Sequence, residues 1–270
     1  MRKQIDYIIT QLRGYYPEEE LRELAYWIVE ETTGLSRTQI LMQTHSQVIP
    51  NLEAILQRLR NQEPIQYIFG HTEWMGLDLR VNTDTLIPRP ETAELVEWII
   101  AENDNNIPLR ITDIGTGSGC IAIALKKHCP TWQIVGVDRS SAALRLAKEN
   151  ARKNNVEVAW EEMDILSKMP DFNDIIVSNP PYICHKEKAE MDSRVTKYEP
   201  HSALFVPDDD PLLFYRRISS MKSSKMLYFE INEAYGNEVC KMMKQLGYKD
   251  VQLKYDIYGK ARMVSGRLDA

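Results

Sequence analysis

The sequence predicts an α/β fold in which a seven-stranded, mostly parallel sheet follows a small bundle of helices. Beyond Leu109, apolar runs typical of buried strands alternate with helical stretches, the pattern of a parallel sheet with helices on both faces. A glycine-rich turn follows the first of these strands. The N-terminal segment instead repeats its apolar side chains with the spacing of a helix.

Length and composition limit the classes of protein to consider. The chain has 270 residues, 43% of them hydrophobic, which is enough for one large domain or two unequal ones. A formal charge of −6 and a pI near 5.5 lack the basic footprint of a protein that grips duplex DNA. The four cysteines are widely spaced, so we expect free thiols in a reducing compartment. Because we find no secretory leader and no membrane-length apolar run, we expect a soluble, cytoplasmic protein.

The N-terminal segment has the periodicity of amphipathic helices. One apolar stripe starts behind a glutamate-rich turn and ends before Gly34, and a second follows Pro50. The stripes consist of Leu21, Leu24, Ala25 and Ile28, and of Leu52, Ile55, Leu56 and Leu59. Alternating apolar and polar residues from Glu63 to Asn82 indicate a connecting hairpin. We predict a helical domain over residues 1–75, a linker over about 63–85 and a second domain over residues 86–270.

The second domain contains the predicted sheet. A helix starts near Glu91, after two prolines that end an extended run. Four apolar runs then predict buried strands: RITDI, QIVGVD, DIIVSN and KMLYFEI. The tail departs from this alternation, because VQLKYDIYG and KARMVSGRL predict two strands joined by a glycine turn. We therefore expect an antiparallel edge at the C-terminal side of the sheet.

A glycine-rich loop follows the first predicted strand and opens a helix. It reads Asp113, Ile114, Gly115, Thr116, Gly117, Ser118, Gly119. Alternate glycines allow sharp turns and a close approach by a ligand. In doubly wound sheets this loop is a ligand-binding position. Asp138 ends the next strand, 19 residues after Gly119, where its carboxylate can accept hydrogen bonds from ribose hydroxyls.

The spacing of these glycines favours S-adenosylmethionine over a dinucleotide. A dinucleotide fingerprint has the pattern G-x-G-x-x-G and places a helix N-terminus at a pyrophosphate. Here the third glycine comes one residue early, and a carboxylate precedes the loop. S-adenosylmethionine has an amino group and a sulfonium but no phosphate, so acidic and carbonyl groups suit it. We predict a Rossmann-like class I methyltransferase domain, with Asp164 positioned to meet the adenine.

The strand that ends at Ser178 runs into Asn179-Pro180-Pro181-Tyr182. Proline cannot donate to a sheet and fixes φ, so the chain leaves the sheet here. The Asn179 side-chain oxygen and the Pro180 carbonyl can accept the two N–H bonds of a planar amide or amine, which orients a poor nucleophile for methyl transfer. Tyr182 offers a flat face for stacking. The predicted chemistry needs no metal and no strong base.

These motifs together resemble the HemK/PrmC-type release factor glutamine methyltransferases over nearly the whole chain. The matching segments are GLSRTQIL, EPIQYIFG, LIPRPETAELVE, DIGTGSGCIAIAL, VSNPPYI and YEPHSAL. The resemblance implies methyl transfer from S-adenosylmethionine to the N5 of the glutamine in the Gly-Gly-Gln motif of bacterial peptide chain release factors. It also implies that the N-terminal helical domain helps to bind that protein substrate.

The resemblance assigns roles residue by residue. It implies that the loop from Gly115 to Gly119 and Asp138 bind the donor and that Asp164 and Ile165 lie by the adenine. We also expect Asp113, which precedes the loop, and Asn179 to contact the donor. Asn179, Pro180, Pro181 and Tyr182 would hold the glutamine, and Asn179, Pro180 and Tyr182 would be catalytic. We expect a monomer that binds neither duplex DNA nor membranes.

Two other functional classes are compatible with parts of the pattern. A nucleic-acid N6-adenine methyltransferase would present the same planar NH₂ group, but it needs base flipping and a target-recognition region. The acidic chain offers neither spare length nor positive charge for these. A non-catalytic binding module is disfavoured because the segment Asn179-Pro180-Pro181-Tyr182, called the acceptor motif below, is complete.

Overall fold

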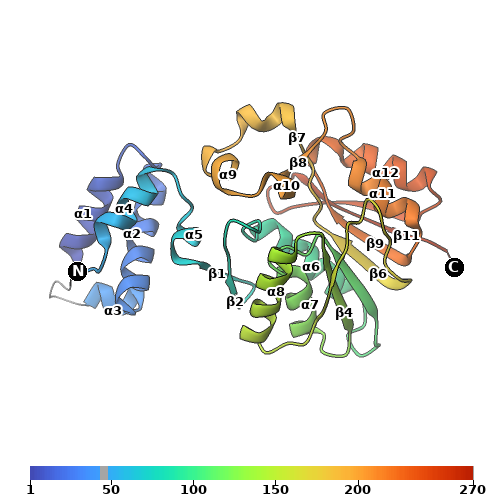
Figure 1. The fold of residues 1–270 in the computed structure, drawn as a ribbon, viewed down its shortest axis with the longest axis horizontal. Helices are drawn as coiled ribbons and strands as arrows, with labels where there is room; N and C mark the ends of the chain where they lie inside the picture. The colour runs from blue at the N-terminus through green and yellow to red at the C-terminus, as the bar shows by residue number, and fades with distance from the viewer. Residues whose placement is uncertain (43–47, 270) are drawn as a thin grey trace. The chain divides into compact units, whose positions relative to one another are not determined.

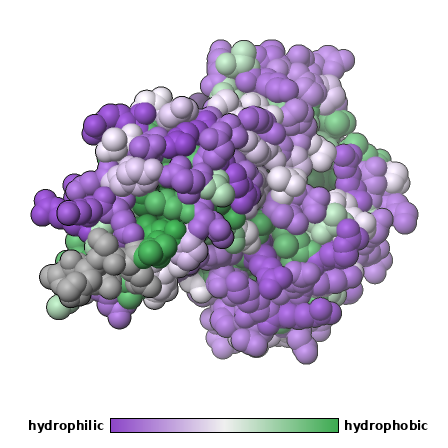
Figure 2. Space-filling model, turned by 60° about the vertical axis from the view of Figure 1, so that its left-hand side comes forward, coloured by the Kyte–Doolittle hydropathy of each residue, from purple (hydrophilic) through white to green (hydrophobic). Residues whose placement is uncertain are grey.

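The computed structural model describes residues 1–42 and 48–269, which form two compact units. The first consists of Met1–Gly70 together with Asp192–Tyr198, and the second of His71–Met191 and Glu199–Ala270. Within the described residues, no helix is long and apolar enough to cross a membrane. The face drawn in Figure 2 is mostly hydrophilic, with hydrophobic residues exposed in smaller groups.

The first unit is helical, as predicted. Helix α2 (Glu18–Thr33) has three glutamates in its first turn, where they stabilise the positive end of the helix dipole. It buries the predicted apolar stripe and ends at Gly34, whose φ of 69° is left-handed. The other helices are α1 (Arg2–Leu12), α3 (Arg37–Met42), α4 (Leu52–Arg60) and α5 (Ile65–Phe69).

A short segment distant in sequence completes this unit. Helix α9 (Ser193–Tyr198) carries Arg194, whose guanidinium lies 2.9 Å from the Glu20 carboxylate and also pairs with Asp192. The Tyr198 hydroxyl donates to the carbonyl of Asn61 at 2.9 Å. No sequence pattern indicated that residues 192–198 would join the N-terminal helices.

The hairpin is shorter than predicted. Only β1 (His71–Trp74) and β2 (Leu77–Arg80) pair, in antiparallel register. The preceding residues, expected to be extended, form α5 instead. Pro64 caps the start of this helix and Gly70, with a φ of 77°, ends it. The alternation of apolar and polar residues is therefore compatible here with a single helical turn that buries Ile65 and Tyr67.

The second unit contains a seven-stranded sheet in the order β10-β11-β9-β6-β3-β4-β5. Figure 1 labels β4, β6, β9 and β11 of this sheet. The strands are β3 (Arg110–Ile114), β4 (Gln133–Asp138), β5 (Ala159–Glu162), β6 (Asn173–Ser178), β9 (Ser224–Glu230), β10 (Lys249–Tyr255) and β11 (Ala261–Arg267). The pairs from β5 to β9 are parallel, whereas β11 is antiparallel to both β9 and β10. The predicted α/β class and antiparallel C-terminal edge are confirmed, with β11 lying inside β10.

Helices cover both faces of the sheet because its central strands are apolar on both sides. Ile175 and Val177 of β6 pack into one core with α6 (Pro90–Glu102) and α7 (Cys120–His128). Ile176, between them, packs into the opposite core with α11 (Leu213–Met221) and α12 (Gly236–Gln245). Helix α8 (Ser141–Lys153) contacts β4 and β5.

The remaining elements of the second unit follow the acceptor motif. They are β7 (Ile183–Cys184), the 3₁₀ helices His185–Glu190 and Glu233–Tyr235, α10 (His201–Leu204) and β8 (Phe205–Val206). Strands β7 and β8 pair in parallel as a separate two-stranded sheet.

Candidate active site

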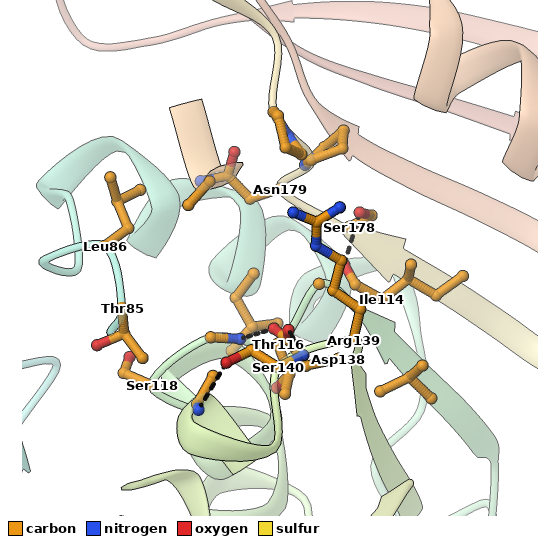
Figure 3. Close-up of a pocket in the computed structure, with 18 of the residues that line it drawn as sticks. Thr85, Leu86, Ile114, Thr116, Ser118, Asp138, Arg139, Ser140, Ser178 and Asn179 are labelled. Atoms are coloured by element: carbon orange, nitrogen blue, oxygen red, sulfur yellow. Dashed lines mark hydrogen bonds between the residues drawn. The ribbon is translucent and has the colours of Figure 1, made fainter. Parts of the chain in front are cut away.

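A cavity opens at the carboxyl ends of β3, β4, β5 and β6. This is the topological switch point of the sheet, because β4 and β5 lie on one side of β3 and β6 lies on the other. Figure 3 shows Thr116, Asp138 and Ser140 grouped on one side, Asn179 on another, and Thr85 and Leu86 on a separate loop. The predicted residues that line the cavity are Gly115, Thr116, Gly117, Ser118, Asp138, Asp164, Ile165, Asn179, Pro180 and Pro181. The sheet therefore brings together residues that lie up to 66 positions apart in the sequence (181 − 115).

The glycine loop turns sharply away from β3. Gly115 and Gly117 have φ values of 72° and 55°, in the left-handed region that favours glycine. A Cβ atom added at Gly115 would meet no protein atom within 4 Å, and one at Gly117 only the Gly115 carbonyl at 3.9 Å. Since both residues line the cavity, side chains there would project into the space that a ligand needs.

Gly119 serves a different purpose from the other two glycines. A Cβ atom there would lie 2.9 Å from the Trp160 ring and 3.1 Å from both Ala147 and Ile123. Gly119 does not line the cavity; it allows the start of α7 to pack tightly against Trp160 and α8.

Asp138 connects the glycine loop to the next helix. Its Oδ2 accepts from the Gly117 N–H at 2.9 Å and its Oδ1 from the Ser140 N–H at 2.9 Å. Ser140 caps α8 by accepting from the Ala143 N–H. The carboxylate is fixed in the cavity wall, and each oxygen retains a lone pair for a ligand hydroxyl.

Asp113 lies beneath the glycine loop and does not line the cavity. It is fully buried, and its Oδ2 accepts a hydrogen bond from the Thr116 hydroxyl at 2.5 Å. Burial raises the pKa of this carboxyl to about 7. Asp113 therefore supports the loop from below, and its expected contact with the donor remains a prediction.

The acceptor motif leaves the sheet at Ser178, whose hydroxyl donates to the Ile114 carbonyl at 2.7 Å. Asn179 follows at the cavity wall, and its Nδ2 donates to the Thr92 hydroxyl at 3.3 Å. Within residues 1–42 and 48–269, no hydrogen bond uses Asn179 Oδ1 or the Pro180 carbonyl. Among the described residues, both oxygens predicted from the motif therefore lack a hydrogen-bond partner, and Asn179 and Pro180 both line the cavity.

Tyr182 is directed toward the protein interior. Its hydroxyl donates to Glu230 Oε1 at 3.1 Å, and its ring packs beside the core under α11 and α12. Burial raises the pKa of this phenol, so it stays protonated. Tyr182 is not among the residues that line the cavity. Stacking of its ring on a substrate amide stays a prediction.

A second loop forms another part of the cavity wall. It includes Leu86 and Arg89, and it is bound to Glu199, a residue with only 4% of its surface exposed. Glu199 accepts from the Ile87 N–H at 3.3 Å and from Arg89 Nη2 at 2.6 Å. Although Arg89 opposes the effect, burial raises the pKa of the Glu199 carboxyl. The carboxylate thus joins the loop before α6 to the loop before α10.

Sequence reasoning did not assign roles to several residues of the cavity wall. They are Asp84, Thr85, Leu86, Pro88, Arg89, Thr92, Arg139, Ser202, Ala203 and Phe214. A signal for some of them was present, because the LIPRPETAELVE and YEPHSAL segments contain Leu86, Thr92 and Ser202. Arg139 and Phe214 belong to no segment that was singled out.

The cavity wall fits S-adenosylmethionine by two structural criteria. The exposed backbone of Gly115 and Gly117 leaves room for a ligand that a Cβ atom would occupy. Three aspartates, Asp84, Asp138 and Asp164, line the wall and suit hydroxyl and ammonium groups. The described residues hold no group of three or more His, Cys, Asp or Glu side chains arranged for a metal ion.

Comparison with known proteins agrees with this fold. Residues 94–197 match the family model "Methyltransferase small domain". A methyltransferase from Pyrococcus furiosus is similar in structure, with a TM-score of 0.53 at 16% identity over 82% of this chain and 99% of that chain. Human methyltransferase 10 domain containing protein gives a TM-score of 0.54 at 18% identity over 72% and 90%. Fold and site define a class I S-adenosylmethionine-dependent methyltransferase.

Residues 5–70 match the family model "PrmC N-terminal domain". The chain is 43% identical to the release factor glutamine methyltransferase of Flavobacterium psychrophilum, over 95% of each chain. It is 42% identical to that of Bacteroides thetaiotaomicron, over 96% of this chain and 97% of the other. The chain therefore belongs to the release factor glutamine methyltransferase family, and the resemblance seen in the sequence motifs is confirmed.

Proposed function

We propose that this protein transfers a methyl group from S-adenosylmethionine to the N5 amide nitrogen of the glutamine in the Gly-Gly-Gln motif of bacterial peptide chain release factors. Its family membership supports the class of substrate. The observation that most supports the proposal concerns Asn179 Oδ1 and the Pro180 carbonyl. Neither oxygen has a hydrogen-bond partner among the described residues, and both residues line the cavity together with the glycine loop.

The acceptor residues address the main chemical difficulty, which is that an amide nitrogen is a weak nucleophile. Two oxygens that accept both N–H bonds of the glutamine NH₂ hold the nitrogen in one orientation. They also stabilise the positive charge that develops there in the transition state. The NH₂ is held against fixed groups, so little reorganisation is needed during the reaction.

When bound, S-adenosylmethionine supplies an electrophilic methyl group on a positively charged sulfur. The chain's own part at that side of the cavity is to bind and orient. Asp138 accepts from ribose hydroxyls, the glycine loop admits the ligand close to the backbone, and Ile165 offers an apolar surface to the adenine. No side chain is required as a strong base, since the nitrogen loses its proton after charge has formed.

The remaining expectations belong to the same proposal. We propose that the helical unit binds the release factor and that the enzyme acts as a monomer in the cytoplasm, where its substrate acts in translation. An acidic chain of charge −6 favours a protein substrate over duplex DNA.

The proposal is tested with radiolabelled S-adenosylmethionine and three acceptors in parallel. These are a purified release factor, the same factor with the glutamine of its Gly-Gly-Gln motif changed to alanine, and duplex DNA. We expect label only on the unchanged factor. Label on DNA but not on the factor would reject the substrate assignment in favour of a nucleic-acid methyltransferase.

A further inference from the structure

The acceptor motif is connected at two points to one buried carboxylate. The Thr92 hydroxyl donates to Glu230 Oε2 at 2.6 Å, and the Tyr182 hydroxyl donates to Glu230 Oε1 at 3.1 Å. Asn179 Nδ2 donates to the Thr92 hydroxyl oxygen at 3.3 Å. A chain of hydrogen bonds therefore runs from Asn179 through Thr92 to Glu230, and a second bond holds Tyr182 to the same carboxylate.

The direction of this chain follows from the number of available protons. A threonine hydroxyl has one proton, and Thr92 donates it to the carboxylate. Toward Asn179 the hydroxyl oxygen can only accept, so it binds the NH₂ of the amide and not the amide oxygen. Asn179 is thereby held in the orientation that turns Oδ1 away from Thr92.

This orientation matters for the proposed reaction, on which the inference rests. The substrate nitrogen arrives as an NH₂ group and needs an acceptor opposite it. An Asn179 amide turned by 180° (a flip of its two ends) would present its own NH₂, and two donors would then face each other. We infer that Thr92 and Glu230 are positioning residues: they select the orientation of the Asn179 amide in which Oδ1 can accept a hydrogen bond from the substrate NH₂.

The surroundings of Glu230 suit this role. Glu230 ends β9, and only 1% of its surface is exposed, so its two oxygens cannot exchange these partners for bulk water. Charged and titratable groups face Glu230 from five places in the fold: Glu91 on α6, Cys120 on α7, Tyr182 in the acceptor motif, Tyr215 on α11 and Arg262 on β11. Burial raises the pKa of the Glu230 carboxyl, whereas the hydrogen bonds from Thr92 and Tyr182 and the Arg262 guanidinium favour the ionised form that accepts both hydroxyl protons.

The inference is tested by changing Thr92 in two ways. Thr92→Val keeps the shape of the side chain and removes the hydroxyl, whereas Thr92→Ser keeps the hydroxyl. Thr112→Val, at a buried threonine in β3, controls for the loss of a buried hydroxyl elsewhere in the sheet. For each variant we would measure kcat and KM with release factor, the dissociation constant of S-adenosylhomocysteine, and the thermal midpoint.

We expect Thr92→Val to lower kcat about fivefold to tenfold, the effect of losing one neutral hydrogen bond. Its KM and its dissociation constant for S-adenosylhomocysteine should stay within about twofold, because the change affects orientation and not donor binding. Thr92→Ser should retain at least about half of the wild-type kcat. A Thr92→Val enzyme with wild-type kcat, or an equal loss in Thr112→Val, would overturn the inference.

Glu230→Gln provides a second test of the same chain of hydrogen bonds, in combination with Thr92→Val. A glutamine can accept at one end only, so one hydroxyl must reverse its direction. Because both residues act through Asn179, the kcat of the Thr92→Val/Glu230→Gln double variant should be no more than about twofold below the kcat of the less active single variant. Independent, multiplying losses would overturn the inference.

A wild-type enzyme that binds the donor but does not methylate release factor would reject the proposed function itself, whereas an active wild type with unaffected variants rejects the inference alone.

Discussion

The substitution Gly119→Ala tests whether the glycine loop is shaped by packing as well as by ligand binding. Its Cβ atom would lie 2.9 Å from the Trp160 ring and 3.1 Å from both Ala147 and Ile123, all of them inside the packed second unit. Overpacking of this kind costs about 1–3 kcal/mol. The φ of 82° adds about 1–2 kcal/mol for a residue with a Cβ atom. We expect a total loss of about 2–5 kcal/mol in the free energy of unfolding, a large part of the usual 5–15 kcal/mol.

Urea unfolding followed by tryptophan fluorescence measures this loss, since Trp74, Trp98, Trp132 and Trp160 all lie in the second unit. Gly247→Ala is the matched control, because its φ is 95° but its Cβ atom would meet nothing within 4 Å. The control should lose only the backbone contribution of about 1–2 kcal/mol. If Gly119→Ala unfolds at the same urea concentration as Gly247→Ala, the packing argument is wrong.

Three further substitutions test individual side chains. Asn179→Ala should abolish methyl transfer while calorimetry shows a nearly unchanged affinity for S-adenosylhomocysteine; wild-type turnover would disprove its role. Asp138→Asn places an NH₂ against the N–H of Gly117 or Ser140, so the dissociation constant of S-adenosylhomocysteine should rise by about tenfold or more, and an unchanged constant would remove Asp138 from the donor site. Burial raises the pKa of Asp113 to about 7. The stability that this carboxyl contributes is therefore complete at a pH below its ordinary pKa and is lost as the pH rises through about 7. Asp113→Asn should therefore be more stable relative to wild type at pH 8 than at pH 5, measured as free energies of unfolding; an equal difference at both pH values would contradict the raised pKa.

Elements with strong local signals were predictable from the sequence. The buried strands β3, β4, β6 and β9 stand out because each is a short, mostly apolar run that lies between turn signals, as expected where helices cover both faces. The glycine loop and the acceptor motif were found because each encodes its own backbone shape. Strand β5 was not found, because it is the edge strand and three of its four residues are exposed or polar. The β5 side chain that packs against the core is Trp160, which lies against Gly136 and Gly119.

The supporting residues of the site were not predictable for a different reason. Thr92 and Glu230 are 138 positions apart, and neither follows a pattern that announces a contact with the other. Their hydrogen bond exists because α6 packs beside β9, which is a property of the tertiary fold. The same applies to Glu199, whose carboxylate meets the backbone of Ile87 across 112 positions. Local sequence motifs predict groups that line the cavity, whereas the groups that orient them come from the arrangement of distant elements.

The position of the acceptor relative to the donor loop follows from the pairing of two strands. Ile114, the last residue of β3, is in register with Ser178, the last residue of β6, and the Ser178 hydroxyl binds the Ile114 carbonyl at 2.7 Å. The donor loop begins one residue after Ile114, and Asn179 follows directly after Ser178. Both binding loops therefore start side by side, separated by one strand spacing of about 4.8 Å. Because the sheet is buried on both faces, this separation is rigid. Holding two reactants at a fixed short distance is worth several kcal/mol of a reaction barrier. A methyl transfer that needs no strong base can thus obtain its rate from the register of β3 and β6, and loosening that register should impair turnover even where every binding residue is kept.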